Sequence, residues 1–449
     1  MTTVEERNYK VIGTRPIRHD GADKVTGRAI YGIDYHMTGE LWGKILRSPH
    51  AHANIVKIDT SKAEALPGVR AVITGRDLPV AADMEVDDGE TSINTMHLSN
   101  NVMAHRKALY RGHAVAAVAA DNQHIAEDAI NLIEVEYEVL PPVLNGREAM
   151  KADAPLVHPE QTTKSMAFRF DPGTDTGEKS NIAGRTEMRL GDIDEGFKQA
   201  DVIVERVFNT NWVHQGYIEA QNATVLWNND DSIQVWNSSQ GTFNQRQLMA
   251  EILKHPVSKI RITPQEIGGG FGGKIPVYLE VPAAVLSKKS GRPVKMMMSR
   301  AEVFEGTGPA SGSETVCKMG ATKDGKIVAA YAELVFEAGA FPGSAVGAGA
   351  QGMFTTYNIE NILIHAYDVV VNKPKSAAYR SPGTPQTCFA AESVVDELAE
   401  KVGIDPLEFR IMNAAKEGDR RADGVAHPIM GNLECMVQLK ESDHYKSDL

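Results

Sequence analysis

A loop of unusual composition occupies residues 265–274, with five glycines around a single phenylalanine, Phe271, and a lysine at its end. The strand-like run 259–262 comes directly before it. Glycine has no Cβ, so the main chain can take positive φ and approach a ligand closely. Successive N–H groups in such a loop suit anions, phosphates above all. The run therefore predicts a site for an anionic ligand; the alternative is a plain glycine turn between a strand and a helix.

Two familiar phosphate motifs do not fit this glycine loop. The dinucleotide pattern G-x-G-x-x-G expects an acidic residue about 20 residues further on, where this chain has Lys288, Lys289 and Arg292. The pattern G-x-x-x-x-G-K-[ST] expects a hydroxyl after its lysine to ligate Mg²⁺, and Ile275 stands there. Neither nucleotide-binding class is therefore indicated by the loop itself.

A second candidate is the arginine loop, residues 378–386, with the sequence AYRSPGTPQ. Two prolines and a glycine predict a rigid loop. Arg380 within it carries a permanently charged fork, which can hold a carboxylate, an oxyanion or a developing negative charge. The alternative for Arg380 is a salt bridge that only braces the loop.

Side chains that hold metals are not clustered. Imidazoles at H-x-H spacing can share one side of a strand and bind a metal, but no cysteine or carboxylate cluster accompanies His36, His50 and His52. We therefore expect a structural role for them. The cysteines form no C-x-x-C pair, which argues against a disulfide framework, a zinc site or an iron–sulfur cluster on this chain. They are Cys317, Cys388 and Cys435.

Composition sets broad limits. The chain has 449 residues, of which 42% are hydrophobic and 24% charged, which is typical of a globular protein with two or three domains. A net charge of −12 argues against nucleic acid as the main partner. No apolar run approaches the length of a membrane span, and the acidic start of the chain is unlike a signal peptide. We expect a cytoplasmic protein with reduced thiols.

Hydrophobic periodicity organises the chain into two parts. After an arm at 1–20, strands and helices alternate through residues 21–150, which predicts a compact α/β unit. The expected elements there are strands at 55–59, 69–73, 115–120 and 132–141, and helices at 60–66 and 121–130, the latter capped by Asp121. Residues 151–185 are rich in Pro, Gly and polar side chains, which predicts a linker. Residues 186–449 form the second part.

The second part contains both candidate loops between regular elements. Strands are expected at 200–208, 232–237, 259–262, 294–298 and 326–336, and helices at 243–253, 277–289 and 388–402. The glycine-rich stretch 347–352 is expected to be a loop. The run Met296–Met298 is expected to pack in the core.

Several longer phrases, in order, carry a family resemblance. They are VTGRAIYGID, LWGKILRSPHAHA, ALPGVRAVITGRDLP, IEVEYEVLPPV, GGGFGGK, GRPVKMMMSRAEVF and the R-x-x-G-x-P-Q loop followed by ESVVDELA. From about residue 15 to 415 the chain resembles the molybdenum hydroxylases, the xanthine dehydrogenase and aldehyde oxidase family. The resemblance implies a mixed α/β (α+β) fold, with an α/β hammerhead-type domain followed by the first molybdopterin-binding domain.

The resemblance also implies a cofactor and site residues. The cofactor would be molybdopterin with molybdenum, in bacteria as its cytosine dinucleotide, and the pterin dithiolene would hold the metal. The main chain at Gly269, Gly270 and Gly272 would approach it, Phe271 would orient a flat substrate, and Arg380 would face the pocket. In the family a glutamine just before a glutamate bonds an oxygen on the metal. Here Val213 takes that place and Gln215 lies two residues on, either facing the metal or as a satisfied buried amide.

The reaction and partners follow from the same resemblance. The chain resembles the front half of a divided subunit, so a second molybdopterin-binding chain would supply the general-base glutamate. Electrons would pass through a [2Fe-2S] subunit and an FAD subunit, in a complex that can itself dimerise. The chemistry would be hydroxylation, or reductive dehydroxylation, of an aromatic, heterocyclic or aldehyde substrate. Two alternatives stay open: a non-catalytic cofactor carrier or assembly scaffold, and a nucleotide-binding α/β protein.

Overall fold

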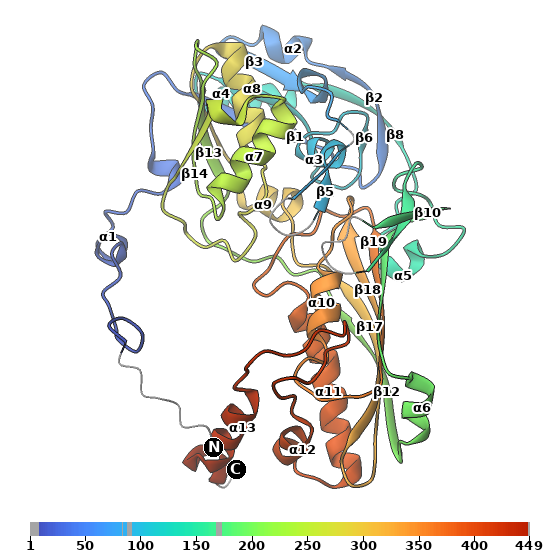
Figure 1. The fold of residues 1–449 in the computed structure, drawn as a ribbon. Coiled ribbons are helices and arrows are strands. Elements are labelled where there is room, and N and C mark those ends of the chain that lie inside the picture. The colour runs from blue at the N-terminus through green and yellow to red at the C-terminus, as the bar shows by residue number, and fades with distance from the viewer. Residues whose placement is uncertain (1–8, 83, 88–91, 168–172, 448–449) are drawn as a thin grey trace.

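The chain folds into two lobes, each built around a seven-stranded sheet with helices on its surface (Figure 1). The computed structural model describes residues 9–82, 84–87, 92–167 and 173–447. Sheets and helices are mixed along the whole chain, which confirms the prediction of a mixed α/β fold. The short helix α1 (Gly21–Thr26) lies outside the two sheets in Figure 1, and its Lys24 Nζ lies 2.9 Å from Glu266 Oε2 of the glycine loop.

The upper lobe joins segments from both predicted parts of the chain. In its sheet β1 pairs in parallel with β16, with Leu41 opposite Val294. In spatial order the strands are β15 (Ile260–Pro264), β14 (Ile233–Asn237), β13 (Asn222–Trp227), β16 (Val294–Met297), β1 (Leu41–Arg47), β7 (Ala114–Ala120) and β3 (Val69–Thr74). The smaller sheet beside it has β6 (Lys107–Ala108), β2 (Ala53–Asp59) and β8 (Glu134–Val139). The helices of this lobe are α2 (Ser61–Ala65), α3 (Thr95–Val102), α4 (Gln123–Asn131), α7 (Thr242–Leu253), α8 (Glu280–Ser290) and α9 (Arg300–Gly306).

The lower lobe contains long strands and the longest helix. Its sheet has the order β10 (Thr174–Lys179), β9 (Thr162–Met166), β11 (Ile182–Leu190), β19 (Ile362–Val370), β18 (Ile327–Gly339), β17 (Ser313–Ala321) and β12 (Val202–Thr210). Its helices are α5 (Gly146–Ala149), α6 (Ile193–Lys198), α10 (Val346–Gly352), α11 (Thr384–Val402), α12 (Pro406–Asn413), α13 (Asn432–Glu441) and α14 (Asp443–Lys446). The remaining elements of the chain are β4 (Glu85–Asp87), β5 (Ser92–Asn94) and the 3₁₀ turns at Gly32–Asp34, Gly75–Asp77 and Val257–Lys259. None of the described helices combines the length and apolar character that crossing a bilayer requires.

Helix α11 fixes the start of the site, because the arginine loop leads directly into it. A proline in the first turn suits the helix start, and Gly403 ends the helix in the left-handed conformation. Val394, Val395 and Leu398 are fully buried, and the helix packs on β12 and β17. The arginine loop therefore projects from a rigid base.

Three local predictions are wrong. Met297, expected in the core, is 38% exposed, although Met296 and Met298 on either side of it are buried. Residues 347–352 belong to helix α10 instead of a loop, because Gly349 lets this helix pack closely against Thr387 of α11. Helix α4 is capped by Asn122, whose side chain accepts from Ile125 N at 3.0 Å. Asp121 instead pairs with two arginines, Arg70 and Arg292.

The stretch predicted as a linker, 151–185, contains β9, β10 and the start of β11. Every described residue of β10 is exposed at the edge of the sheet. Because neither face of this strand is buried, its sequence does not alternate between apolar and polar residues and could not be recognised as a strand. Residues 168–172, part of the polar run behind the linker prediction, lie outside the described residues. The division into domains stays a prediction.

A buried histidine should make the stability of the fold depend on pH. His113 is fully buried, its Nδ1 accepts from Leu109 N at 3.2 Å, and its Nε2 donates to Asn100 O at 2.6 Å. Burial lowers the pKa of His113 from 6.5 to about 4. Between pH 6.5 and about pH 4, His113 is protonated in the unfolded chain but neutral in the folded chain. The free energy of unfolding therefore decreases as the pH is lowered through this range.

Urea unfolding at pH 7, 6 and 5 measures this effect. We expect His113→Gln to reduce the pH slope of the free energy of unfolding by about 1 kcal/mol per pH unit. The matched control, His124→Gln, changes an exposed histidine of α4 and should leave the slope as it is. Equal slopes in all three proteins would contradict the prediction.

Candidate functional site

The glycine loop lies where the pairing of two strands brings separate polar segments together. β14 and β15 pair in parallel, with Asn237 opposite Pro264 at their carboxyl ends. In a parallel pair the segments that follow both strands leave the sheet at the same edge. Residues 238–241, after β14, therefore lie beside the glycine loop, after β15.

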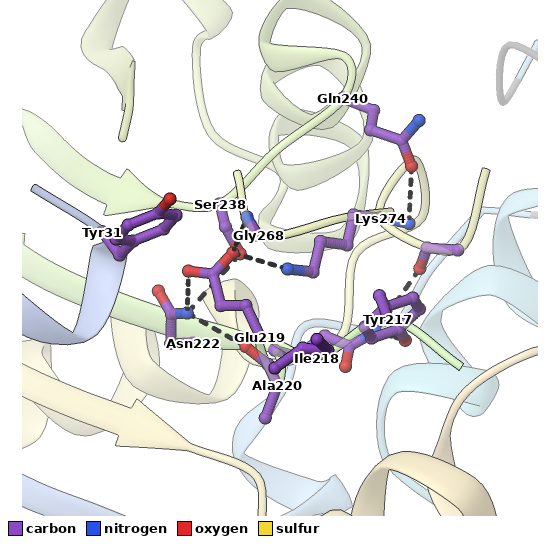
Figure 2. Close-up of polar contacts among 12 residues, drawn as sticks. Tyr31, Tyr217, Ile218, Glu219, Ala220, Asn222, Ser238, Gln240, Gly268 and Lys274 are labelled. Carbon is purple, nitrogen blue, oxygen red and sulfur yellow. Dashed lines mark hydrogen bonds and ion pairs between the residues drawn. The ribbon is translucent and has the colours of Figure 1, made fainter. Parts of the chain in front are cut away.

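Gln240 holds the glycine loop in its shape. Its Oε1 accepts from Lys274 N at 3.2 Å (Figure 2). The same oxygen accepts from Gly272 N at 2.9 Å, and the main-chain N–H of Gln240 donates to Lys274 O at 3.1 Å. The loop bends with Phe271 at a φ of +53°, and 46% of the surface of this residue is exposed. The side chain of Gln240 thus fixes the turn from which the phenyl ring projects.

A buried ion pair closes the loop from the other side (Figure 2). Lys274 Nζ lies 2.7 Å from Glu219 Oε2, and the lysine is only 1% exposed. The same carboxylate accepts from Gly268 N at 2.7 Å and from Asn222 Nδ2 at 3.0 Å. Burial lowers the pKa of Lys274, and the Glu219 carboxylate opposes this shift. Glu219 therefore ties together the first glycine of the loop and its last residue.

The arginine loop is bound directly to the glycine loop. Arg380 N donates to Phe271 O at 2.9 Å. A Cβ on Gly272, which has a φ of +104°, would lie 2.5 Å from both Ala378 Cβ and Ala378 O, so the two loops touch without space for a side chain. Arg380 and Ser381 both have positive φ, at 28° and 67°, a conformation that non-glycine residues adopt mainly where surrounding contacts impose it.

The guanidinium of Arg380 is exposed and pairs with no carboxylate of the described residues. The salt bridge considered as its alternative role is thus not found in the part of the chain that the structure describes. A cation without a partner beside Phe271 is available to a ligand.

Gln215 lies behind the glycine loop and is 5% exposed. Its Nε2 donates to Ala378 O at 2.7 Å and to Gly308 O at 3.0 Å, while its Oε1 has no hydrogen-bond partner. A Cβ on Gly273 would lie 3.0 Å from this oxygen. The side chain therefore links the arginine loop to the segment after α9, and its role toward a metal stays a prediction.

An open cavity of about 600 Å³ lies beside the two loops. It is lined by Gln240, Ile267, Gly270, Phe271, Gly272, Ile275, Ala378, Arg380 and Pro382. Three consecutive N–H groups of the loop, at Gly269, Gly270 and Phe271, donate to no acceptor among the described residues. Consecutive free N–H donors with an arginine beside them suit the oxygens of a pterin phosphate or a metal-bound oxygen. The residues present thus fit a molybdopterin cofactor.

Sequence reasoning assigned no role to Gln240 or Glu219. The feature that could have pointed to Gln240 is its position in the polar turn after β14. This strand belongs to the same sheet as β15, which precedes the glycine loop. Recognising it requires the parallel pairing of β14 with β15, which the local pattern does not contain. Glu219 has no comparable signal, because its contacts all depend on the folded loop.

Histidines do not form a metal centre. His52 is 4% exposed, with Nδ1 2.9 Å from Pro141 O. His50 lies edge-on to Tyr137 at 5.0 Å, and His36 Nδ1 lies 2.8 Å from Glu40 Oε1. No three His, Cys, Asp or Glu side chains gather as a metal site within the described ranges.

Comparisons with known proteins agree with this geometry. Residues 175–414 match the model of the molybdopterin cofactor-binding domain, and residues 26–141 match that of the aldehyde oxidase and xanthine dehydrogenase a/b hammerhead domain. The chain is 30% identical over 439 residues to the nicotinate dehydrogenase large molybdopterin subunit of Eubacterium barkeri, covering 97% of both chains.

Other relatives are longer. The chain is 31% identical to the xanthine dehydrogenase molybdenum-binding subunit of Escherichia coli O157:H7, covering 95% of this chain and 54% of that protein. It superposes on quinoline 2-oxidoreductase from Pseudomonas putida 86 with a TM-score of 0.85 and 25% identity, over 97% of this chain and 54% of the other. Thus it spans about half of these two proteins. The family matches cover most of the described chain, and they carry the conclusion: the protein belongs to the molybdenum hydroxylase family of xanthine dehydrogenases and aldehyde oxidases, as a molybdopterin-binding chain.

Proposed function

We propose that the chain is the molybdopterin-binding subunit of a multi-subunit oxidoreductase that hydroxylates an aromatic, heterocyclic or aldehyde substrate. The observation that carries this is the meeting of three free N–H donors, the ring of Phe271 and the unpaired Arg380 around one cavity. When bound, the cofactor supplies a molybdenum centre that can exchange an oxygen atom and two electrons with the substrate.

Each residue at the cavity has a physical task in this proposal. The N–H groups of Gly269 and Gly270 bind oxygens of the cofactor, and Gly272 allows the close approach of the arginine loop. The ring of Phe271 orients a flat substrate by its face or edge. The Arg380 guanidinium stabilises negative charge on the substrate as the reaction proceeds.

Two glutamines complete the set. The Gln240 amide lies on the cavity side of the glycine loop, where its Nε2 can donate to an oxygen on the metal. Gln215 acts as a positioning residue, because both of its donors hold main-chain oxygens of the neighbouring segments. This assignment moves the metal-facing amide expected at Gln215 to Gln240.

Further chains belong to the proposal. A second molybdopterin-binding chain supplies the general-base carboxylate. This is supported by the lengths of the relatives, since one matches this chain over 97% of its own length and another over 54%. A [2Fe-2S] subunit and an FAD subunit carry electrons, and the whole complex can dimerise. The cofactor carries a cytosine dinucleotide, and the complex works in a bacterial cytoplasm. With a strong reductant as donor, the same site runs in reverse as a dehydroxylase.

The test is analysis of the complex purified from its native host. Molybdenum and pterin should each be present at about one per copy of this chain, with dye-linked turnover of a heterocycle or an aldehyde. A complex that holds the cofactor but shows no turnover with any substrate class would favour the carrier function. A complex without pterin would remove the proposal.

Arg380→Lys tests whether the site needs the planar guanidinium of Arg380 or only its positive charge. Lysine keeps the positive charge but loses the planar fork, so we expect kcat to fall about tenfold while the molybdenum content stays unchanged. The control is Arg420→Lys, since Arg420 lies near the C-terminus and its side chain donates to Gly424 O. Unchanged kcat in Arg380→Lys would show that this side chain does not face the reaction.

A further inference from the structure

A larger cavity, of about 1100 Å³, lies between the two lobes. One wall is formed by described residues of the upper lobe within 80–81 and 94–109, together with Glu85, and the opposite wall by residues 341–347 and 375–382 of the lower lobe. Ile275, Ala378 and Pro382 line both this cavity and the open cavity beside Phe271. The two spaces are therefore neighbours at the arginine loop.

Two ammonium groups in this cavity lack a carboxylate partner. Lys375 Nζ donates to Gly343 O at 3.2 Å, and neither Lys375 nor Lys107 forms an ion pair with a carboxylate of the described residues. Three acids also line the cavity, but each has donors of its own. Asp368 accepts from two N–H groups at 2.8 Å, Glu85 pairs with Lys164 at 3.0 Å, and Glu160 pairs with Lys179 at 3.1 Å. Arg106 also lines the cavity and forms no ion pair with a described carboxylate, so together with the two lysines it outweighs the charge of Asp368 and leaves net attraction for an anion.

A flat aromatic surface lies in the same cavity. The rings of His97 and His158 stack at 4.9 Å with an interplanar angle of 29°, and both residues are partly exposed. Phe341 lies beside both rings, with centroid distances of 5.7 Å to His97 and 5.5 Å to His158. Lys107 is close enough to His158 to act on its charge, and burial lowers the pKa of His158 to about 4. Neutral His158 thus offers a ring surface beside a cation.

We propose that this cavity is the substrate vestibule of the Phe271–Arg380 site and that it selects planar carboxylates, aromatic or heteroaromatic. Lys375 and Lys107 attract the carboxylate, and the stacked face of His97 and His158 receives the ring. The inference rests on the proposed function and narrows its substrate class. An apolar surface with few placed charges is the usual way in which a pocket fixes the orientation of a small ligand.

The nucleotide part of the cofactor is a less suitable occupant. Phosphates are commonly bound by consecutive main-chain N–H groups. The adjacent N–H pair in this vestibule, at Gly343 and Ser344, already donates to Asp368. Arg106 is the one arginine among the described lining residues, and single flexible lysines suit one carboxylate better than a pyrophosphate, which several arginine forks bind bidentately.

Calorimetric titration of the full chain with benzoate and with benzamide tests the proposal. The two probes share a ring and differ in charge. We expect benzoate to bind about tenfold more tightly than benzamide, and Lys375→Gln to reduce this difference severalfold without changing benzamide binding. Lys107→Gln should weaken benzoate severalfold by the same reasoning. The control Lys326→Gln changes a lysine at the other end of β18, paired with Glu360, and should alter neither affinity.

The other outcomes of this titration would contradict the proposal that the cavity is a substrate vestibule. Equal affinities for both probes, or benzoate binding unchanged in both folded variants, would do so. Cytidine monophosphate that binds more tightly than benzoate and is lost in Lys375→Gln would assign the space to the cofactor. Thermal melting establishes that the variants fold. The titration needs no metal, so its failure is distinct from that of the proposed function. An active complex that binds benzoate and benzamide equally would contradict only the vestibule, whereas a complex without pterin would contradict the proposed function.

Discussion

Replacing Lys274 with methionine is expected to lower the free energy of unfolding by about 3–5 kcal/mol. Methionine has a similar length and packs well, so the loss is mainly electrostatic. The Glu219 carboxylate, 10% exposed, would keep its hydrogen bonds from Gly268 N and Asn222 but lose the only cation within ion-pair distance in the described chain. An uncompensated buried charge is among the most destabilising single changes.

The double variant Glu219→Gln/Lys274→Met supplies the matched control. It removes both charges, and the glutamine Oε1 can still accept from Gly268 N. We expect it to recover more than half of the stability lost in Lys274→Met. Urea unfolding of the wild type, both single variants and the double variant gives the coupling energy. A double variant as unstable as the sum of the singles would show that the charges do not interact.

The same cycle connects stability to function. Because Glu219 and Lys274 hold the two ends of the glycine loop, Lys274→Met should also lower the pterin content of the assembled complex. The double variant should restore part of it. A pterin content that follows stability in this way supports the view that the ion pair acts by preorganising the loop, which lowers the entropy lost when the ligand binds.

The local elements could be predicted because each carries its own pattern. The apolar run at 115–120 and the apolar stripe of α11 were sufficient to find a strand and a helix. What the pattern could not give is the neighbour of each strand. β1 and β16 lie side by side although about 250 residues separate them, and such pairing depends on packing and twist summed over the whole sheet.

For the candidate site too, the sequence identified individual residues but not which of them are neighbours in space. Phe271 and Arg380 stand out by residue type within rigid, glycine- or proline-rich loops, so the sequence sufficed to single them out. Their mutual hydrogen bond, Arg380 N to Phe271 O, joins segments more than a hundred residues apart. Gln240 was overlooked because a glutamine in a polar turn is ordinary; only the parallel pairing of β14 with β15 makes it a neighbour of the glycine loop.

Gly272→Ala should be the most damaging small substitution at the site. A Cβ there would lie 2.5 Å from Ala378 O and 2.7 Å from Ala378 C, main-chain atoms that cannot rotate away. Its φ of +104° adds strain for any L-residue with a side chain. To relieve the overlap the glycine and arginine loops must separate by about 1 Å, which displaces Phe271 from Arg380 and should lower kcat/KM about a hundredfold or more.

Two other glycines separate the causes of this loss. Gly291→Ala places a methyl group at a φ of +67° in open space, so it should cost about 1 kcal/mol of stability and no activity. For Gly270→Ala, at a negative φ, the nearest atoms belong to the side chain of Gln240, with Oε1 at 2.4 Å. The amide must then loosen its bonds to Gly272 N and Lys274 N, but no main-chain atoms have to separate, so the activity should fall less. The expected order of turnover in the assembled complex is therefore Gly291→Ala above Gly270→Ala above Gly272→Ala. Full activity in Gly272→Ala would mean that contact between the two loops is not needed for the chemistry.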